Sequence, residues 1–213
     1  MSKGFSNPRE TWDARFSVDD YIFGTAPNAW LAQHADLFQP GMRVLAVADG
    51  EGRNSVWLAQ RGLHVDAFDI SPVGIEKAKK LAQMRGVDVN FSICSAEDFS
   101  WKALEYDAVV AIFIQFADPE TRAMLFKQMK SALKADGVLV LQGYTPKQLE
   151  YKTGGPPNLD HLYTEALLQE AFSDLNITEC LAYEEVLTEG TQHHGRSALV
   201  GMVARKPFGC NFQ

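Results

Sequence analysis

Cysteine is scarce in this sequence of 213 residues. Its three cysteines, Cys94, Cys180 and Cys210, lie far apart and form no Cys-x-x-Cys pair. This spacing indicates neither a disulfide framework nor a zinc cluster, because each needs paired or closely spaced cysteines. The first residues contain no apolar signal-peptide core, so we expect a cytoplasmic protein with reduced thiols.

The sequence also lacks a long apolar segment and an excess of positive charge. No run approaches the roughly 18 apolar residues of a membrane span. Lysine and arginine number 20 against 27 aspartates and glutamates, which gives a net charge of −7. Nucleic-acid affinity depends on clustered basic residues, so we expect no nucleic-acid or membrane partner.

What the chain does contain is an alternation of strand-like and helix-like segments from about residue 40, typical of a sheet with helices on both faces. Helix starts are marked by Ser71-Pro72, Asp118-Pro119 and Thr164, where a capping side chain precedes the first turn. We predict a single domain, with 1–39 as an N-terminal segment and 40–207 as the α/β core. Strands are expected at 44–48, 65–68, 87–93, 108–113 and 138–141.

The end of the chain departs from this alternation. Strand-like segments at 177–187 and 198–204 have no helical segment between them, and we expect a polar loop over 188–197. Such a hairpin makes at least one strand antiparallel to its neighbour. The predicted fold class is therefore α/β, a doubly wound and mostly parallel seven-stranded sheet with a C-terminal antiparallel hairpin.

A glycine turn follows the first strand. The run Asp49-Gly50-Glu51-Gly52 leads into a helix, and the free N–H groups of a helix N-terminus can cradle a ligand. Ser55 replaces the third glycine of the Gly-x-Gly-x-x-Gly pattern, and no Walker A lysine follows. Because Glu51 would repel a pyrophosphate, the turn favours a cofactor without phosphates.

An acidic residue follows the second strand. Asp69 lies 19 residues after Gly50, where a carboxylate can accept hydrogen bonds from a ribose diol. Asp66 is the competing candidate. Strand alternation and the helix start at Ser71-Pro72 favour Asp69, and a solvated aspartate at the strand end is the alternative interpretation.

The run from Val44 to Ala59, VLAVADGEGRNSVWLA, resembles the first motif of the class I S-adenosylmethionine-dependent methyltransferases. Its Gly-Arg-Asn-Ser portion is closest to the tellurite-resistance and thiopurine methyltransferase branch. The resemblance spans about residues 10–207, with further similar segments at Phe68–Ser71, Ser95–Asp98, Tyr106–Val110, Leu133–Leu139 and Val203–Pro207.

The resemblance implies S-adenosylmethionine as the cofactor. It places the methionine end at Gly50, Gly52 and Asn54, and the ribose at Asp69, with the adenine between Ile70, Ala96 and Glu97.

This sequence departs from the family at two positions, since an acid is usual in place of Ala46 and a glycine in place of Ala48. Asp49 or Glu51 would then meet the methionine ammonium. We favour Asp49, because an acid at the loop apex, such as Glu51, usually points to solvent.

The acceptor side is less defined. In the resembled branch the N-terminal segment covers the cofactor, which would bring Arg15 or Tyr21 to its carboxylate end; packing against the sheet edge is the alternative. Gln115, the loop 153–158 and His194 are the candidates for holding the acceptor. Gln115 and His194 are the candidate catalytic residues, Gln115 to orient the acceptor and His194 as a general base or acceptor-binding group. A helix-capping amide and a solvated histidine are the alternatives for Gln115 and His194.

The predicted function is in-line methyl transfer to a small-molecule acceptor, catalysed mainly by positioning and without a metal. We expect a monomer or weak homodimer. Two alternatives remain open: a non-catalytic S-adenosylmethionine-binding module, suggested by Ala46 and Ala48, and a nicotinamide-dependent oxidoreductase. The Glu51-bearing loop and the final hairpin count against the second.

Overall fold

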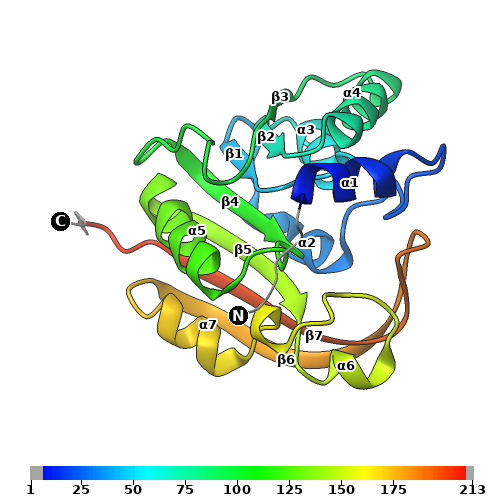
Figure 1. The fold of residues 1–213 in the computed structure, drawn as a ribbon. Helices are drawn as coiled ribbons and strands as arrows, with labels where there is room; N and C mark the ends of the chain where they lie inside the picture. Colours follow the sequence, from blue (N-terminus) through cyan, green and yellow to red (C-terminus); the bar gives the residue numbers. More distant parts are fainter. Residues whose placement is uncertain (1–6, 210–213) are drawn as a thin grey trace.

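The computed structural model describes residues 7–209, so Cys210 lies outside the described part of the chain. Seven strands form one sheet in the order β3-β2-β1-β4-β5-β7-β6 (Figure 1). Strands β1 to β5 are parallel, whereas β7 is antiparallel to both β5 and β6. The predicted fold class is confirmed.

The strands are β1 (Arg43–Ala46), β2 (His64–Asp69), β3 (Asn90–Ile93), β4 (Tyr106–Ile112), β5 (Leu133–Tyr144), β6 (Asn176–Glu189) and β7 (His193–Arg205). The helices are α1 (Pro8–Phe16), α2 (Ala29–Gln33), α3 (Arg53–Gln60), α4 (Pro72–Arg85), α5 (Pro119–Ala132), α6 (Gln148–Tyr151) and α7 (Glu165–Ala171). Two 3-10 turns lie at Ala35–Leu37 and Leu159–His161. No helix within 7–209 is long and apolar enough to cross a membrane.

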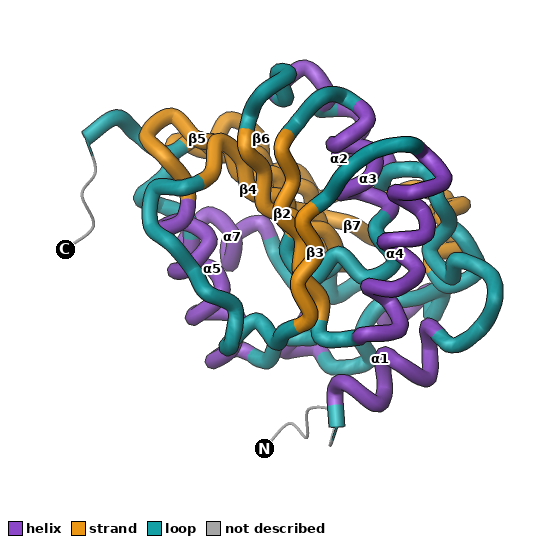
Figure 2. Tube along the Cα trace, turned by 90° about the horizontal axis from the view of Figure 1, so that it is seen from above, coloured by secondary structure: helices purple, strands orange, loops and turns teal. Residues whose placement is uncertain are grey.

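Helices cover both faces of the sheet (Figure 2). On one face, α5 and α7 contribute Leu125, Phe126, Leu168 and Phe172 to one buried cluster. On the other face, α2 and α3 contribute Trp30, Leu31 and Leu58 to a second cluster. The central strands are apolar on both sides for this reason.

The predicted helix caps are confirmed. The N–H of Gly74 donates to Ser71 Oγ at 3.0 Å, and the N–H of Thr121 donates to Asp118 Oδ1 at 2.9 Å. Thr164 caps α7 through the N–H of Leu167 at 3.1 Å. Each cap satisfies a donor that the first helical turn leaves unpaired.

The prediction of a polar loop over residues 188–197 is wrong. Strands β6 and β7 continue to Glu189 and from His193, which leaves only 190–192 as the turn. The polar residues remain in strands because one face of this hairpin is exposed, so polar and buried side chains alternate: Leu187, His193 and Ser197 are buried, whereas Thr188, His194 and Arg196 are exposed.

Candidate functional site

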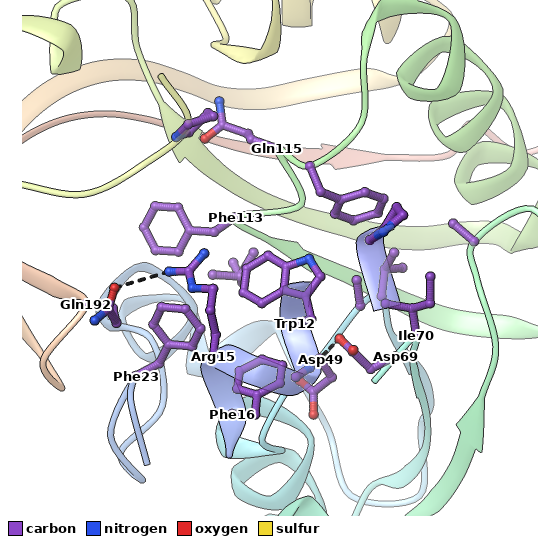
Figure 3. Close-up of a pocket in the computed structure, with 18 of the residues that line it drawn as sticks. Trp12, Arg15, Phe16, Phe23, Asp49, Asp69, Ile70, Phe113, Gln115 and Gln192 are labelled. Atoms are coloured by element: carbon purple, nitrogen blue, oxygen red, sulfur yellow. Dashed lines mark hydrogen bonds between the residues drawn. The ribbon is translucent and has the colours of Figure 1, made fainter. Parts of the chain in front are cut away.

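A cavity of about 450 Å³ lies at the carboxyl ends of the parallel strands, covered by α1 (Figure 3). Ligands of open α/β sheets bind at this edge. One part of the cavity wall follows β1, β2 and β3, and includes Ala48, Asp49, Gly50, Asp69, Ile70, Ala96 and Glu97. Another part comes from β4, β5, β7 and a loop, and includes Phe113, Tyr144, Gly154, Pro156, Pro157 and His193.

The glycine turn after β1 has a left-handed backbone at Ala48, Gly50 and Gly52, with φ of 48°, 60° and 87°. Gly50 lines the cavity, and a Cβ there would lie 3.2 Å from Cζ of Phe16. A glycine at this position lets α1 approach the turn. A Cβ on Gly52 would lie 2.6 Å from Cβ of Ala78 in α4, so Gly52 serves helix packing and does not line the cavity.

Asp69 joins the end of β2 to the glycine turn. Its Oδ2 accepts the N–H of Gly50 and its Oδ1 the N–H of Ser71, both at 2.9 Å. Burial raises the pKa of Asp69 to about 6, although these two N–H groups lower it. Each carboxylate oxygen retains a second lone pair, so Asp69 can also accept hydrogen bonds from ligand hydroxyls in the cavity.

Asp66, the competing candidate, lies elsewhere. Its carboxylate accepts hydrogen bonds from Arg43 at 2.8 Å and from Asn90 at 2.7 Å. Asp66 does not line the cavity, whereas Asp69 does.

Asp49 is a half-buried acid at the cavity wall. Ser55, the residue in place of the third glycine, donates its hydroxyl to Asp49 Oδ2 at 2.5 Å. Burial raises the pKa of Asp49 to about 7, and the Ser55 hydrogen bond opposes this rise. Within the described residues no lysine, arginine or histidine forms an ion pair with Asp49, so the site is suited to a cationic ligand group.

The expectation that Glu51 points to solvent is wrong. Glu51 is 2% exposed, forms an ion pair with Lys77 of α4 at 2.5 Å, and accepts the N–H of Phe23 at 3.4 Å. The loop apex is buried because the N-terminal segment lies over it. Glu51 does not line the cavity, which leaves Asp49 as the acid of this turn that does.

Two further side chains of the motif hold the N-terminal segment. Arg53 donates to the carbonyl of Phe23 at 3.1 Å and pairs with Glu189 of β6 at 2.8 Å. Asn54 lines the cavity, and its Oδ1 accepts the N–H of Asn28 at 2.9 Å. Asn54 therefore lies at the predicted site with its oxygen already bound within the protein.

The N-terminal segment covers the cavity, with Trp12, Arg15 and Phe16 of α1 in its wall (Figure 3). Arg15 donates to Gln192 Oε1 at 3.2 Å, which links α1 to the turn between β6 and β7. Tyr21 lies outside the cavity, where its hydroxyl donates to the carbonyl of Lys77 at 2.9 Å.

The acceptor candidates are placed differently from their predicted roles. Gln115 lines the cavity, but its Nε2 donates to the carbonyls of Tyr144 and His161 at 2.9 and 3.0 Å, and its Oε1 accepts the N–H of Tyr144. Both N–H donors are thus used to fix neighbouring loops, and the amide caps no helix. Residues Gly154–Pro157 of the predicted loop do line the cavity.

His194 is exposed and does not line the cavity, whereas His193 is 7% exposed and does. Adjacent strand residues point to opposite faces, so the one-residue difference reverses the side chain. The signal was available in the alternation from buried Leu187 through Glu189, which pairs with His193 across the hairpin. This alternation was not used because residues 188–197 were predicted to form a loop.

Comparison with known proteins gives a consistent assignment. Residues 44–137 match a family model described as a methyltransferase domain. The chain is 30% identical over 133 residues to the tRNA 5-carboxymethoxyuridine methyltransferase of Escherichia coli K12, which covers 60% of this chain and 50% of that protein. It is 26% identical over 184 residues to probable thiol methyltransferase 2 of Arabidopsis thaliana, which covers 84% of this chain and 79% of that protein.

The chain spans only 39% to 50% of the length of the first curated relatives that it matches. Among solved structures, TehB from Haemophilus influenzae superposes with a TM-score of 0.70 at 18% identity, over 93% of this chain and 66% of TehB. A structure reported for the conversion of a disulfide bond into a thioacetal group during echinomycin biosynthesis gives 0.76 at 16% identity, over 96% and 95%. These two likenesses concern the fold.

The domain match and the named relatives set aside a nicotinamide-dependent oxidoreductase. Together with the sheet order and its closing antiparallel hairpin, they support a class I S-adenosylmethionine-dependent methyltransferase, with the domain match confined to residues 44–137.

Proposed function

We propose that this chain transfers a methyl group from S-adenosylmethionine to a small thiol by direct in-line displacement. When bound, the cofactor supplies an electrophilic sulfonium methyl group, so the protein needs no nucleophile of its own. The observation that carries the proposal is one cavity whose wall joins Asp49, Asp69 and Ala96 to an aromatic region around Phe113.

The residues on the first side of this cavity fit the cofactor. Asp49, a half-buried carboxylate with no ion pair among residues 7–209, would hold the methionine ammonium. Asp69 would accept the ribose hydroxyls, and Ile70, Ala96 and Glu97 would flank the adenine. Arg15, which lines the cavity from α1, would face the carboxylate of the methionine.

The cover over the cavity limits the size of the acceptor. The N–H of Thr191 donates to the carbonyl of Ile22 at 2.9 Å, and Arg15 is bound to Gln192, so the hairpin turn holds the N-terminal segment in place. A cavity of about 450 Å³ must hold the cofactor and the acceptor together. Both facts favour a small molecule, and the net charge of −7 disfavours tRNA.

A thiol is the acceptor class that the remaining wall supports. Phe23, Phe113, Pro156 and Pro157 present apolar surface, which suits a soft, weakly hydrated nucleophile better than an amine or a carboxylate. The relative that covers 84% of this chain is named a probable thiol methyltransferase, which supports the same class.

The test is a turnover assay with methyl-labelled S-adenosylmethionine. We expect label to enter small thiols and S-adenosylhomocysteine to accumulate only when a thiol is present. Bulk tRNA should take up no label. Label in tRNA alone would assign a macromolecular acceptor, and cofactor binding without turnover of any acceptor would favour the non-catalytic module.

A further inference from the structure

His193 stands in an aromatic enclosure in the wall of the cavity. It is the first residue of β7 and is 7% exposed. Its ring centroid lies 4.4 Å from that of Phe23, 4.3 Å from that of Phe113 and 5.7 Å from that of Tyr144. All four residues line the cavity. Rings from three separate segments therefore fix the orientation of this imidazole.

One edge of the imidazole faces a carboxylate. Glu189 pairs with His193 in the hairpin register, and its Oε2 lies 3.8 Å from Nδ1. Nδ1 is buried and makes no hydrogen bond within the described residues. Because Nδ1 faces Glu189, Nε2 is the ring nitrogen available to a ligand in the cavity.

Glu189 itself is held rigidly. Its Oε2 pairs with Arg53 at 2.8 Å, and its Oε1 accepts the N–H of Ala29 at 2.9 Å and a side-chain N–H of Asn28 at 3.1 Å. These contacts hold the Glu189 carboxylate beside His193 and leave it ionised.

Burial and the surrounding charges favour the neutral form of the imidazole. Burial lowers the pKa of His193, Glu189 opposes this shift, and Arg53 and Arg15 act in the same direction as burial. Glu189 is ionised, because its contacts with His193, Arg53 and the N–H of Ala29 outweigh burial and lower its pKa to about 2. Burial raises the pKa of Tyr144 far above its ordinary value, so that hydroxyl keeps its proton.

A second polar group accompanies the imidazole. The hydroxyl oxygen of Tyr144 is buried and has no hydrogen-bond partner within residues 7–209, although Tyr144 lines the cavity. Buried hydroxyl groups in proteins are normally hydrogen-bonded. A heteroatom of the acceptor would provide the partner that Tyr144 lacks.

We propose that His193 is the catalytic base of the methyl transfer and that the acceptor is a thiol that carries its proton at neutral pH. This inference rests on the proposed function. As the acceptor sulfur bonds to the methyl carbon, the sulfonium C–S bond breaks, its electron pair stays on the cofactor sulfur, and the thiol proton passes to Nε2 of His193. Glu189 is a positioning residue that stabilises the imidazolium, and the Tyr144 hydroxyl orients the acceptor.

The test compares two acceptors in the variant His193→Gln. Benzyl thiol carries its proton at neutral pH and needs a base, whereas 4-nitrothiophenol is already ionised and does not. At pH 7 we expect kcat to fall about 100-fold or more with benzyl thiol, and less than about 3-fold with 4-nitrothiophenol. With benzyl thiol the variant should recover as pH rises, because the thiol then ionises without help.

The matched control is His194→Gln, since this neighbouring histidine is exposed and lies outside the cavity. It should keep the wild-type rate with both acceptors. With saturating S-adenosylmethionine, kcat of the wild-type enzyme should also show an acid limb with benzyl thiol, at a pH below the ordinary pKa of histidine because the pKa of His193 is lowered, and no such limb with 4-nitrothiophenol.

Equal losses with both acceptors in His193→Gln, or identical acid limbs in the wild type, would overturn the role as base. Absence of wild-type turnover with either thiol would instead overturn the proposed function. Calorimetric titration of the variant with S-adenosylhomocysteine should give the wild-type affinity, which separates loss of catalysis from loss of cofactor binding.

Discussion

At the scale of single residues, Asp69 has two tasks, because its carboxylate both accepts two backbone N–H groups and lines the cavity. Asp69→Ala should weaken S-adenosylmethionine binding at least tenfold, since each charge-assisted hydrogen bond contributes about 1.5–3 kcal/mol. It should also lower the melting temperature, because the N–H groups of Gly50 and Ser71 lose their acceptor. Calorimetry and thermal denaturation measure the two effects.

Asp66→Ala provides the comparison. Asp66 binds Arg43 and Asn90 away from the cavity, so this substitution should lower stability while leaving cofactor affinity within about twofold. A tenfold loss of affinity in Asp66→Ala would show that the ribose lies elsewhere.

The raised pKa of Asp49 predicts that cofactor binding depends on pH. Its pKa of about 7 in the free protein means that the carboxyl is partly protonated at neutral pH, and a bound ammonium would favour the ionised form. Binding should therefore release protons near pH 6.5, and affinity should rise as pH increases through about 7. Calorimetry in buffers of different ionisation enthalpy measures this release.

Asp49→Asn keeps the size of the side chain and removes its charge, so it should weaken binding and abolish the proton release between pH 6.5 and 7.5. Glu51→Gln should do neither, because Glu51 faces Lys77 and Phe23 outside the cavity. Equal, negligible effects of both substitutions on affinity would mean that no acid in the turn meets the ammonium.

At the scale of elements, the pair of Lys77 and Glu51 fastens the N-terminal segment to α4. Lys77 Nζ also donates to the carbonyls of Phe16, Val18 and Asp20 at 3.3, 2.9 and 2.7 Å. Lys77→Met should lower the free energy of unfolding by about 3–5 kcal/mol, because Glu51 then remains as a buried, unpaired charge. Urea denaturation measures this loss.

Adding Glu51→Gln to Lys77→Met removes the unpaired charge and should restore part of that stability. The coupling in this double-mutant cycle should amount to roughly 1–3 kcal/mol. Simple addition of the two single losses would show that the pair is screened by solvent and does not fasten the segment.

Elements differed in how well the sequence alone predicted them. The starts of α4, α5 and α7 followed from local signals at Ser71, Asp118 and Thr164, since a cap depends on residues close in sequence. The extent of the hairpin strands did not follow from local signals, because the polar composition of 188–197 is that of a loop. Only the register with the neighbouring strand shows that this composition belongs to one exposed face.

The same distinction holds for the site. Asp49, Gly50, Asp69, Ile70 and Ala96 follow strand ends and could be placed by motif and spacing. The roles of Gln115 and Glu51 could not, because their partners, His161 and Lys77, are distant in sequence. His194 was predicted instead of His193, because the register of the hairpin could not be determined from the sequence.

At the scale of the whole molecule, cofactor choice has a direct thermodynamic readout. S-adenosylmethionine and S-adenosylhomocysteine should each raise the melting temperature, since a ligand that binds the native state stabilises it by about 2.7 kcal/mol at 100 times its Kd. NADP should have no effect, because its phosphates would meet Asp49 and Asp69 in the cavity wall. Stabilisation by NADP alone would contradict the cofactor assignment.

The N-terminal segment and the C-terminal hairpin meet where the N–H of Ala29 donates to Glu189, across a separation of 160 residues. During translation the contacts of the N-terminal segment with Lys77 of α4 can form early, whereas its contacts with β6 and with the hairpin turn must wait until these segments are made. A nascent chain that has reached only β5 already contains the glycine turn and Asp69, but it lacks Glu189, Gln192 and His193. A chain that stopped at β5 would therefore keep the contacts of Lys77 with the N-terminal segment but lack the hairpin contacts that complete the cover.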